Sequence, residues 1–368
     1  MTQSNPSQSP ERLLSLDFFR GATMFLLIAE FTHLFSHLYD PALEGTLIYS
    51  IGEQFHHHPW NGLRFWDLVQ PYFMFIVGVA MPYSFSNRIR KGKTRGQISR
   101  HAIQRAFLLL VLGWALYCID SGKIVFRFQN VLAQIAVTYI LAYLVMHKPA
   151  KIQILFSLLL IALTEIIYRT FPVEGFNHPF VANENFGTWL DLQYGGADLN
   201  GHWVSFNAIP TTAHTIWGVL TGQLLMSKRT PQQKLKIMII AGVIGVVAGY
   251  ALNPVTPIIK RISTSSFVIV SGGWTLLTLA FSYWLIDMKK RQKWSIFFRV
   301  VGLNPLFIYL FAHVGGGDFI EHIIHPFSFF LFGWMGILMA SILSSAIVLF
   351  LLWYITHWLH KNKIYIRI

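Results

Sequence analysis

The chain has 368 residues, of which 54% are hydrophobic and only 12% are charged. Soluble domains carry about 25% charged residues, so this composition argues strongly against a soluble enzyme and against a disordered or fibrous protein. The formal net charge is +13, which in a soluble protein would indicate a nucleic-acid partner. Its meaning here depends on where the charges lie along the chain. The single cysteine, Cys118, excludes an intrachain disulfide.

Long apolar runs predict an all-α, polytopic membrane protein with about ten transmembrane helices in one bundle. A helix that crosses the bilayer needs about 20 largely apolar residues. The polar residues 1–11 are expected to form a disordered tail, and the first apolar run is too long for a cleaved signal peptide. Residues 12–368 then form a single transmembrane domain, in which Phe327–Gly333 either extends the last helix or forms a separate re-entrant piece. The predicted spans are 18–38, 68–86, 106–119, 131–146, 152–168, 209–226, 237–252, 267–286, 300–313 and 335–358.

The positive-inside rule predicts the orientation of these helices. When both termini are placed in the cytoplasm, most Lys and Arg residues fall in the inner segments and most acidic residues in the outer ones. Topology therefore accounts for most of the net charge, and we expect the lipid bilayer rather than nucleic acid as the partner. The two longest outer segments, residues 39–67 and 169–208, are long enough to be functional.

The first predicted helix carries three polar residues that are costly in a membrane. Glu30, His33 and His37 have the spacing i, i+3 and i+7, which places them on one face of a continuous helix. That face is expected to look into the bundle or into a wet cavity near the outer side. The alternative is that Glu30 is protonated or hydrogen-bonded to a neighbouring helix, with the histidines at the interface.

A second polar cluster precedes the second predicted span. His56, His57 and His58 are consecutive and offer an acid–base group near neutral pH. They do not predict a metal site, because adjacent residues rarely converge on one ion and no other Cys or His pattern completes a ligand set. Asp67 lies just before the helix, where a carboxylate commonly caps free backbone N–H groups, so capping is favoured over catalysis on sequence alone.

The motifs around this cluster resemble the heparan-α-glucosaminide N-acetyltransferase family, which includes many bacterial relatives. Their order is kept over most of residues 12–368. The resemblance rests on residues 57–63 (HHPWNGL), 67–69 (DLV) and 71–78 (PYFMFIVG), and on 15–21 (SLDFFRG), 130–136 (NVLAQIA), 208–212 (AIPTT), 265–268 (SSFV), 272–274 (GGW) and 302–305 (GLNP).

The resemblance implies a transmembrane acyltransferase that moves the acetyl group of cytosolic acetyl-CoA to an amino sugar on the far side. It also implies a homodimer in the cytoplasmic (inner) membrane of a bacterium, with the active histidine towards the outer side. The family's active histidine lies three residues before the Trp of its Trp-Asn-Gly motif, which is His57 here. The family often has an Asn near the outer end of the first helix, whereas this chain has Glu30 and Phe31 there.

The chemistry of acetyl transfer suggests a role for each of these residues. A histidine can take the proton of the amine, or it can be acetylated first and pass the group on. Asn61 and the backbone around it are candidates for hydrogen bonds to the oxyanion, and Asp67 for orienting His57. Glu30 is a candidate for holding the amino group of the acceptor or for sharing protons with His57.

The donor must enter from the cytoplasmic side. A basic loop after the second span offers Arg88, Arg90, Lys91 and Lys93 to the phosphates of CoA, although topology, or binding of anionic lipid, explains such a cluster more simply. A polar path through the bundle is also required. Candidates for lining it, each of which is equally explained by helix–helix hydrogen bonds, are Gln129, Asn130, Gln134, His214 and Asn304.

The sequence thus favours a membrane-bound, acetyl-CoA-dependent N-acetyltransferase acting on a glucosamine-type sugar, without a metal. A transporter or permease for an amino sugar is the alternative, because ten spans with an ionisable first helix suit transport too. Against transport, the chain has no inverted repeat and no pair of broken helices. A purely structural membrane protein is disfavoured by the polar residues around Glu30 and His57.

Overall fold

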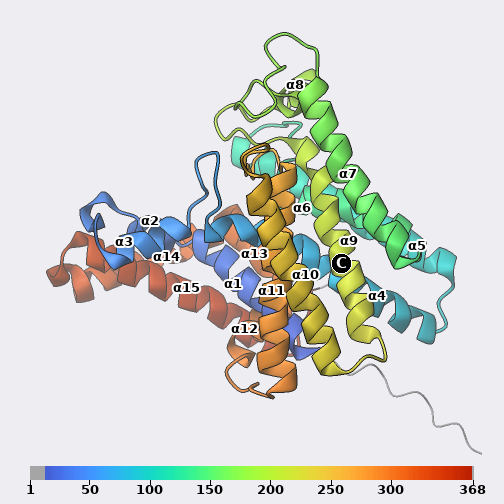
Figure 1. Cartoon of the computed structure of the whole chain (residues 1–368). Coiled ribbons are helices and arrows are strands. Elements are labelled where there is room, and N and C mark those ends of the chain that lie inside the picture. The colour runs from blue at the N-terminus through green and yellow to red at the C-terminus, as the bar shows by residue number, and fades with distance from the viewer. Residues whose placement is uncertain (1–12, 367–368) are drawn as a thin grey trace, which may run out of the picture.

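The computed structural model describes residues 13–366, so the tail predicted at residues 1–11 lies outside the described part (Figure 1). The regular secondary structure of these residues is helical, with one isolated β-bridge and no strand among them. The all-α prediction is therefore confirmed. The α-helices are α1 (Leu14–Glu30), α2 (Leu34–Leu38), α3 (Leu47–Gln54), α4 (Val69–Arg90), α5 (Arg95–Ser121), α6 (Val131–Val145), α7 (Ala150–Thr170), α8 (Phe186–Gln193), α9 (Ala208–Met226), α10 (Pro231–Leu252), α11 (Ser265–Ser282), α12 (Ile296–Val301), α13 (Pro305–Phe311), α14 (Gly317–Phe332) and α15 (Ile337–Lys361).

Within the described residues, six helices are long and apolar enough to cross a membrane, and α6 is a shorter apolar helix. These six are α4, α5, α7, α10, α11 and α15, where α4 and α11 are counted with the turns that adjoin them. The count of ten spans and the side of each terminus stay predictions. α4 and α11 are mostly buried, whereas α5, α7, α10 and α15 expose most of their apolar surface, as expected for helices that face lipid.

The helix α4 is held against α9 by close backbone contact. A Cβ atom on Gly78 would lie 2.0 Å from the carbonyl oxygen of Thr215, and one on Gly218 would lie 2.2 Å from that of Phe75. Small residues allow membrane helices to approach this closely. The contact fixes α4, which carries the candidate site at its first turn.

The first predicted span is broken, and this corrects one expectation. α1 ends at Glu30, and His33 has a left-handed backbone (φ 58°) before α2 begins. Because a left-handed residue interrupts the helical repeat, Glu30, His33 and His37 do not share one helix face. The imidazole of His33 instead lies 3.2 Å from a carboxylate oxygen of Asp318, whereas Glu30 lines an open cavity.

Two other segments also differ from the predicted spans. The region predicted as one helix at 300–313 contains α12, α13 and the start of a π-helical segment at Ala312–Gly316. Phe327–Gly333 is the end of α14 and not an extension of the last helix, because Gly336 (φ 94°) separates the two. In Figure 1, α14 and α15 extend with α2 and α3 to one side of the molecule, whereas α5 lies on the opposite side.

Candidate active site

Asp67 is buried in the short 3₁₀ turn Phe65–Leu68 that leads into α4. Its Oδ1 lies 2.9 Å from Nδ1 of His57, and its Oδ2 accepts hydrogen bonds from the backbone N–H groups of Arg64 (2.9 Å) and His58 (3.2 Å). The carboxylate therefore caps the turn and contacts the histidine at once. The capping that the sequence favoured is present, and the same carboxylate contacts His57, whereas a catalytic role for Asp67 stays a prediction.

His57 lies between this carboxylate and an open cavity. Its ring is edge-on to Trp203 at a centroid distance of 5.2 Å. In the part of the chain that the structure describes, both polar neighbours of the ring contact Nδ1, which leaves Nε2 without a hydrogen-bond partner. Burial, together with the nearby ammonium of Lys260, lowers the pKa of His57 to about 4 despite the opposing effect of Asp67. The imidazole is therefore neutral at physiological pH and able to act as a base or nucleophile.

Lys260 is the second polar neighbour of His57. Its Nζ lies 3.1 Å from Nδ1 of His57 and 3.7 Å from Oδ1 of Asp67. Burial lowers the pKa of this lysine to about 8, although the carboxylates of Asp67 and Glu30 act in the opposite direction. No local feature of the sequence marks Lys260 as part of a site, because it lies 203 residues after His57, in a predicted outer segment.

The Trp-Asn-Gly motif joins the loops of the site. Asn61 forms the isolated antiparallel bridge with Ile259, and the N–H of Gly62 donates to the carbonyl of Ile258 over 2.8 Å. This pairing holds the segment that ends in Lys260 against the histidine loop. The side chain of Asn61 is exposed and lies outside the cavity lining, so the structure assigns its backbone, rather than its amide, a visible role.

Glu30 and His57 line the same cavity of about 340 Å³. Asn130, Gln129 and Gln134, three of the residues proposed for a polar path, line it as well. His214 lies elsewhere, buried and bonded to the backbone of Val268. The lining comprises Leu27, Glu30, Phe31, His57, Trp66, Val69, Gln70, Phe73, Tyr117, Gln129, Asn130, Val131, Gln134, Trp203, Lys260, Tyr309 and His313.

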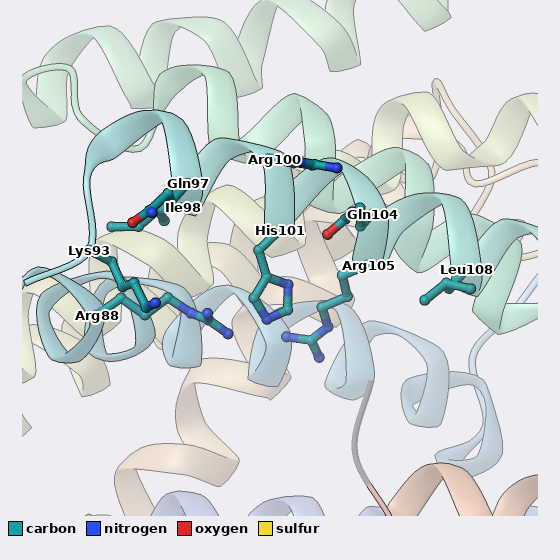
Figure 2. Close-up of a pocket in the computed structure, with 9 residues that line it drawn as sticks. All are labelled: Arg88, Lys93, Gln97, Ile98, Arg100, His101, Gln104, Arg105 and Leu108. Carbon is teal, nitrogen blue, oxygen red and sulfur yellow. The ribbon is translucent and has the colours of Figure 1, made fainter. Parts of the chain in front are cut away.

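A basic cleft of about 480 Å³ lies at the other end of α4, where the chain turns into α5. Figure 2 shows Arg88 of α4 and His101 and Arg105 of α5 reaching into the same space, with Lys93 beside them. Two of the four predicted phosphate contacts, Arg88 and Lys93, thus line the cleft. The other two, Arg90 and Lys91, are exposed outside it.

The position at which α5 begins explains why part of this cleft was not predicted from the sequence. α5 begins at Arg95, whereas the span was predicted to begin at residue 106, so Arg100 and Arg105 lie on a helix rather than in a loop. The helix presents Arg105 to this cleft and to two neighbouring cavities. Its guanidinium also lies 5.3 Å from the centre of the Tyr139 ring.

Asn304 lies away from both sites. Its Nδ2 donates to the carbonyl of Ile364 and its Oδ1 accepts from the N–H of Ile366, at 2.9 and 2.8 Å. Both ends of the amide therefore bind the backbone near the C-terminus. It lines neither the cavity at His57 nor the basic cleft.

Comparison with known proteins identifies the family to which the chain is similar. A family model described as heparan-alpha-glucosaminide N-acetyltransferase, catalytic, matches residues 12–248, more than half of the chain. Two curated proteins of the same name match as well: the protein of Homo sapiens is 30% identical over 142 residues, and that of Mus musculus 29% over 140 residues. Each match covers 36% of this chain and less than a fifth of the relative, 19% and 18% respectively.

Proposed function

Because the chain belongs to the heparan-alpha-glucosaminide N-acetyltransferase family, we propose that it is a membrane-bound N-acetyltransferase with His57 as its catalytic residue. The donor is acetyl-CoA, and the acceptor is the free amine of a glucosamine-type sugar. The observation that carries this proposal is the imidazole of His57, held through Nδ1 by the buried Asp67 and open at Nε2 to a cavity.

The reaction breaks the C–S bond of the thioester and forms a C–N bond to the acceptor. In a direct transfer, Nε2 of His57 takes the proton that the amine loses and then returns it to the thiolate of CoA. In a two-step transfer, Nε2 first attacks the thioester, and the amine then attacks acetyl-His57. Both routes need the neutral imidazole and its Nε2 lone pair. Glu30, across the same cavity, is placed to accept a hydrogen bond from the free amino group of the acceptor before it reacts.

The donor enters from the opposite end of α4. Twenty-two residues of α-helix extend about 33 Å at 1.5 Å per residue, close to the thickness of the hydrocarbon core. The basic cleft at Arg88 and Arg105 suits the phosphates of CoA, because Arg makes charge-assisted hydrogen bonds to phosphate oxygens. We therefore place the cleft on the cytoplasmic side of an inner membrane and the acceptor on the outer side.

The test uses purified protein, labelled acetyl-CoA and glucosamine. We expect acetyl transfer to fall by more than 100-fold in His57→Ala, because neither route has a substitute for Nε2. His56→Ala is the matched control, since Nδ1 of His56 bonds the carbonyl of Gly52 and the ring is outside the cavity lining. Its activity is expected to stay within about twofold of the wild type.

Two outcomes would contradict the proposal. One is acetyl transfer that survives in His57→Ala. The other is uptake of glucosamine into proteoliposomes without an acetyl donor, which would favour a transporter. Mass spectrometry after mixing with acetyl-CoA alone separates the two routes, because only the two-step route leaves an acetyl group on the peptide that contains His57.

A further inference from the structure

Lys260 is a buried cation beside the proposed catalytic histidine. Its side chain is only 7% exposed, and its Nζ contacts Nδ1 of His57 and lies 3.4 Å from the carbonyl oxygen of Trp66. The ring of Trp203 covers it, with its centre 5.5 Å from Nζ. A buried charge is costly unless a partner compensates it, and the partner here is the carboxylate of Asp67.

The atoms around Nδ1 of His57 allow two arrangements that exclude each other. When Nδ1 carries the proton, it donates to Oδ1 of Asp67, and Nε2 keeps its lone pair. When the proton is on Nε2, Nδ1 accepts from the ammonium of Lys260. Only the first arrangement gives the cavity a basic nitrogen, and it requires that Lys260 donate to Asp67 or to the backbone of Trp66 instead.

The combined charge of Asp67 and Lys260 determines whether the imidazole of His57 takes a second proton. A carboxylate alone would favour the imidazolium form of a neighbouring histidine. Here the positive charge of Lys260 lies as close to the ring as the negative charge of Asp67 does. The two charges largely cancel at the imidazole, so the histidine gains an oriented hydrogen bond without being driven to protonate.

We propose that Lys260 is a positioning residue, whose ammonium offsets the charge of Asp67 and so keeps His57 neutral while Asp67 orients it. The inference rests on the proposed function of His57. The other charged groups near the ring are Glu30 across the cavity and Arg261, the next residue along the chain, whose charge acts in the same direction as that of Lys260. Arg64 contacts the backbone carbonyl of His57 and not its ring.

Diethylpyrocarbonate tests this inference without any substrate, because it modifies neutral imidazole and not imidazolium. The measured quantity is the rate at which His57 is modified at pH 5 and at pH 7.5, followed by mass spectrometry and corrected for hydrolysis of the reagent. We expect nearly equal rates in the wild type. In Lys260→Gln, which removes the charge but keeps an N–H donor for Asp67, the rate at pH 5 is expected to fall at least threefold below that at pH 7.5.

Three further variants complete the design. Lys260→Arg keeps the charge and is expected to behave as the wild type. Lys260→Gln combined with Asp67→Asn removes both charges and is expected to restore nearly equal rates. Lys123→Gln, at an exposed lysine, is the matched control and is expected to leave both rates unchanged.

Equal rates at the two pH values in folded Lys260→Gln would overturn the proposal. If that variant does not fold, Lys260→Met takes its place. If neither Lys260→Gln nor Lys260→Met folds, the lysine is needed for folding instead. That outcome would also overturn the proposal. A shift in the modification rates without any acetyl transfer would overturn the proposed function while leaving the effect of Lys260 on His57 established.

Discussion

Asp67 takes part both in the turn that precedes α4 and in the contact that holds the imidazole of His57. One carboxylate oxygen accepts two backbone N–H groups, and the other contacts His57. Each of these contacts limits where the carboxylate can lie, because Asp67 is only 1% exposed. The ring is consequently oriented by the same hydrogen bonds that begin α4, so a change at this residue would affect both folding and chemistry.

The pH dependence of the reaction follows from the environment of His57. Its pKa is lowered to about 4, so the reactive neutral form predominates above that pH and is lost as the pH falls through 4. We expect kcat, measured with both substrates saturating, to stay nearly constant from about pH 5.5 to pH 7. An ordinary histidine, with a pKa near 6.5, would be about half protonated at pH 6.5 and about nine-tenths protonated at pH 5.5.

The measurement is a series of initial rates between pH 4.5 and pH 8. Saturating acceptor removes the ionisation of the free amine from the profile. An acid limb centred near pH 6.5 would show that the charges around His57 do not act on it as the structure implies. Above about pH 8 the ammonium of Lys260 itself loses its proton, but His57 is neutral at that pH with or without this charge, so the plateau is expected to continue.

The helix α4 links the histidine loop to the rest of the molecule through its contact with α9. Gly78 and Gly218 face each other's helix so closely that a Cβ atom on either would overlap a backbone carbonyl. Backbone cannot move aside as a flexible side chain can, so the two helices would have to separate. Separation of α4 from α9 would shift the first turn of α4 and with it Asp67.

Gly78→Ala is therefore expected to destabilise the protein. Overpacking of this kind typically costs about 1–3 kcal/mol, which a lower melting temperature in detergent would report. Gly96→Ala is the control, because Gly96 lies in α5 with open space around its Cβ position, and alanine favours a helix. A melting temperature of Gly78→Ala equal to that of Gly96→Ala would contradict the close contact.

The predictable elements are those whose signal is local. The runs that became α4 and α6 are apolar, and both helices begin within one residue of the predicted spans, whereas α10 begins six residues before its predicted start. The break at His33 was not predictable, because a left-handed conformation at a non-glycine residue depends on tertiary contacts. The early start of α5 was missed because its first turns are polar, although Thr94 and Gln97 form a capping box there.

The candidate site was predictable only in part, because some of its residues are brought together by contacts between distant parts of the chain. His57 and Asp67 lie ten residues apart in one motif, and the sequence analysis named both. Lys260 reaches them through the bridge between Asn61 and Ile259, which joins segments far apart in the chain. Arg105 lies in the predicted basic region, but its place in the cleft depends on the helical geometry of α5.

At the scale of the whole molecule, the two sites lie at opposite ends of α4. His57 is held by the turn that begins this helix, whereas Arg88 lies in its last turn. A transferase that takes its donor from one side of a membrane and its acceptor from the other needs this separation. Under the proposed function, different residues would bind the phosphates of the donor and carry out the chemistry at its thioester, and mutations should separate the two.

Arg88→Ala and Arg105→Ala are expected to raise the KM for acetyl-CoA about tenfold or more, with kcat changed less than threefold. Loss of a phosphate contact weakens binding of a part of the donor far from the reacting carbon, and a hydrogen bond to a charged group contributes about 1.5–3 kcal/mol. Arg90→Ala is the matched control, because Arg90 is exposed in the same helix turn but outside the cleft.

A second donor distinguishes phosphate binding from a general effect of charge. Acetyl-dephospho-CoA lacks the 3′-phosphate, so a variant that has lost the contact to that phosphate should use both donors with similar KM values. Higher salt should also raise the KM of the wild type more than that of the variants, because it screens the same attraction. Equal KM values for acetyl-CoA in Arg88→Ala, Arg105→Ala and Arg90→Ala would place the donor elsewhere. The lost positive charge would then affect donor binding only through the general surface charge and not through contacts in the cleft.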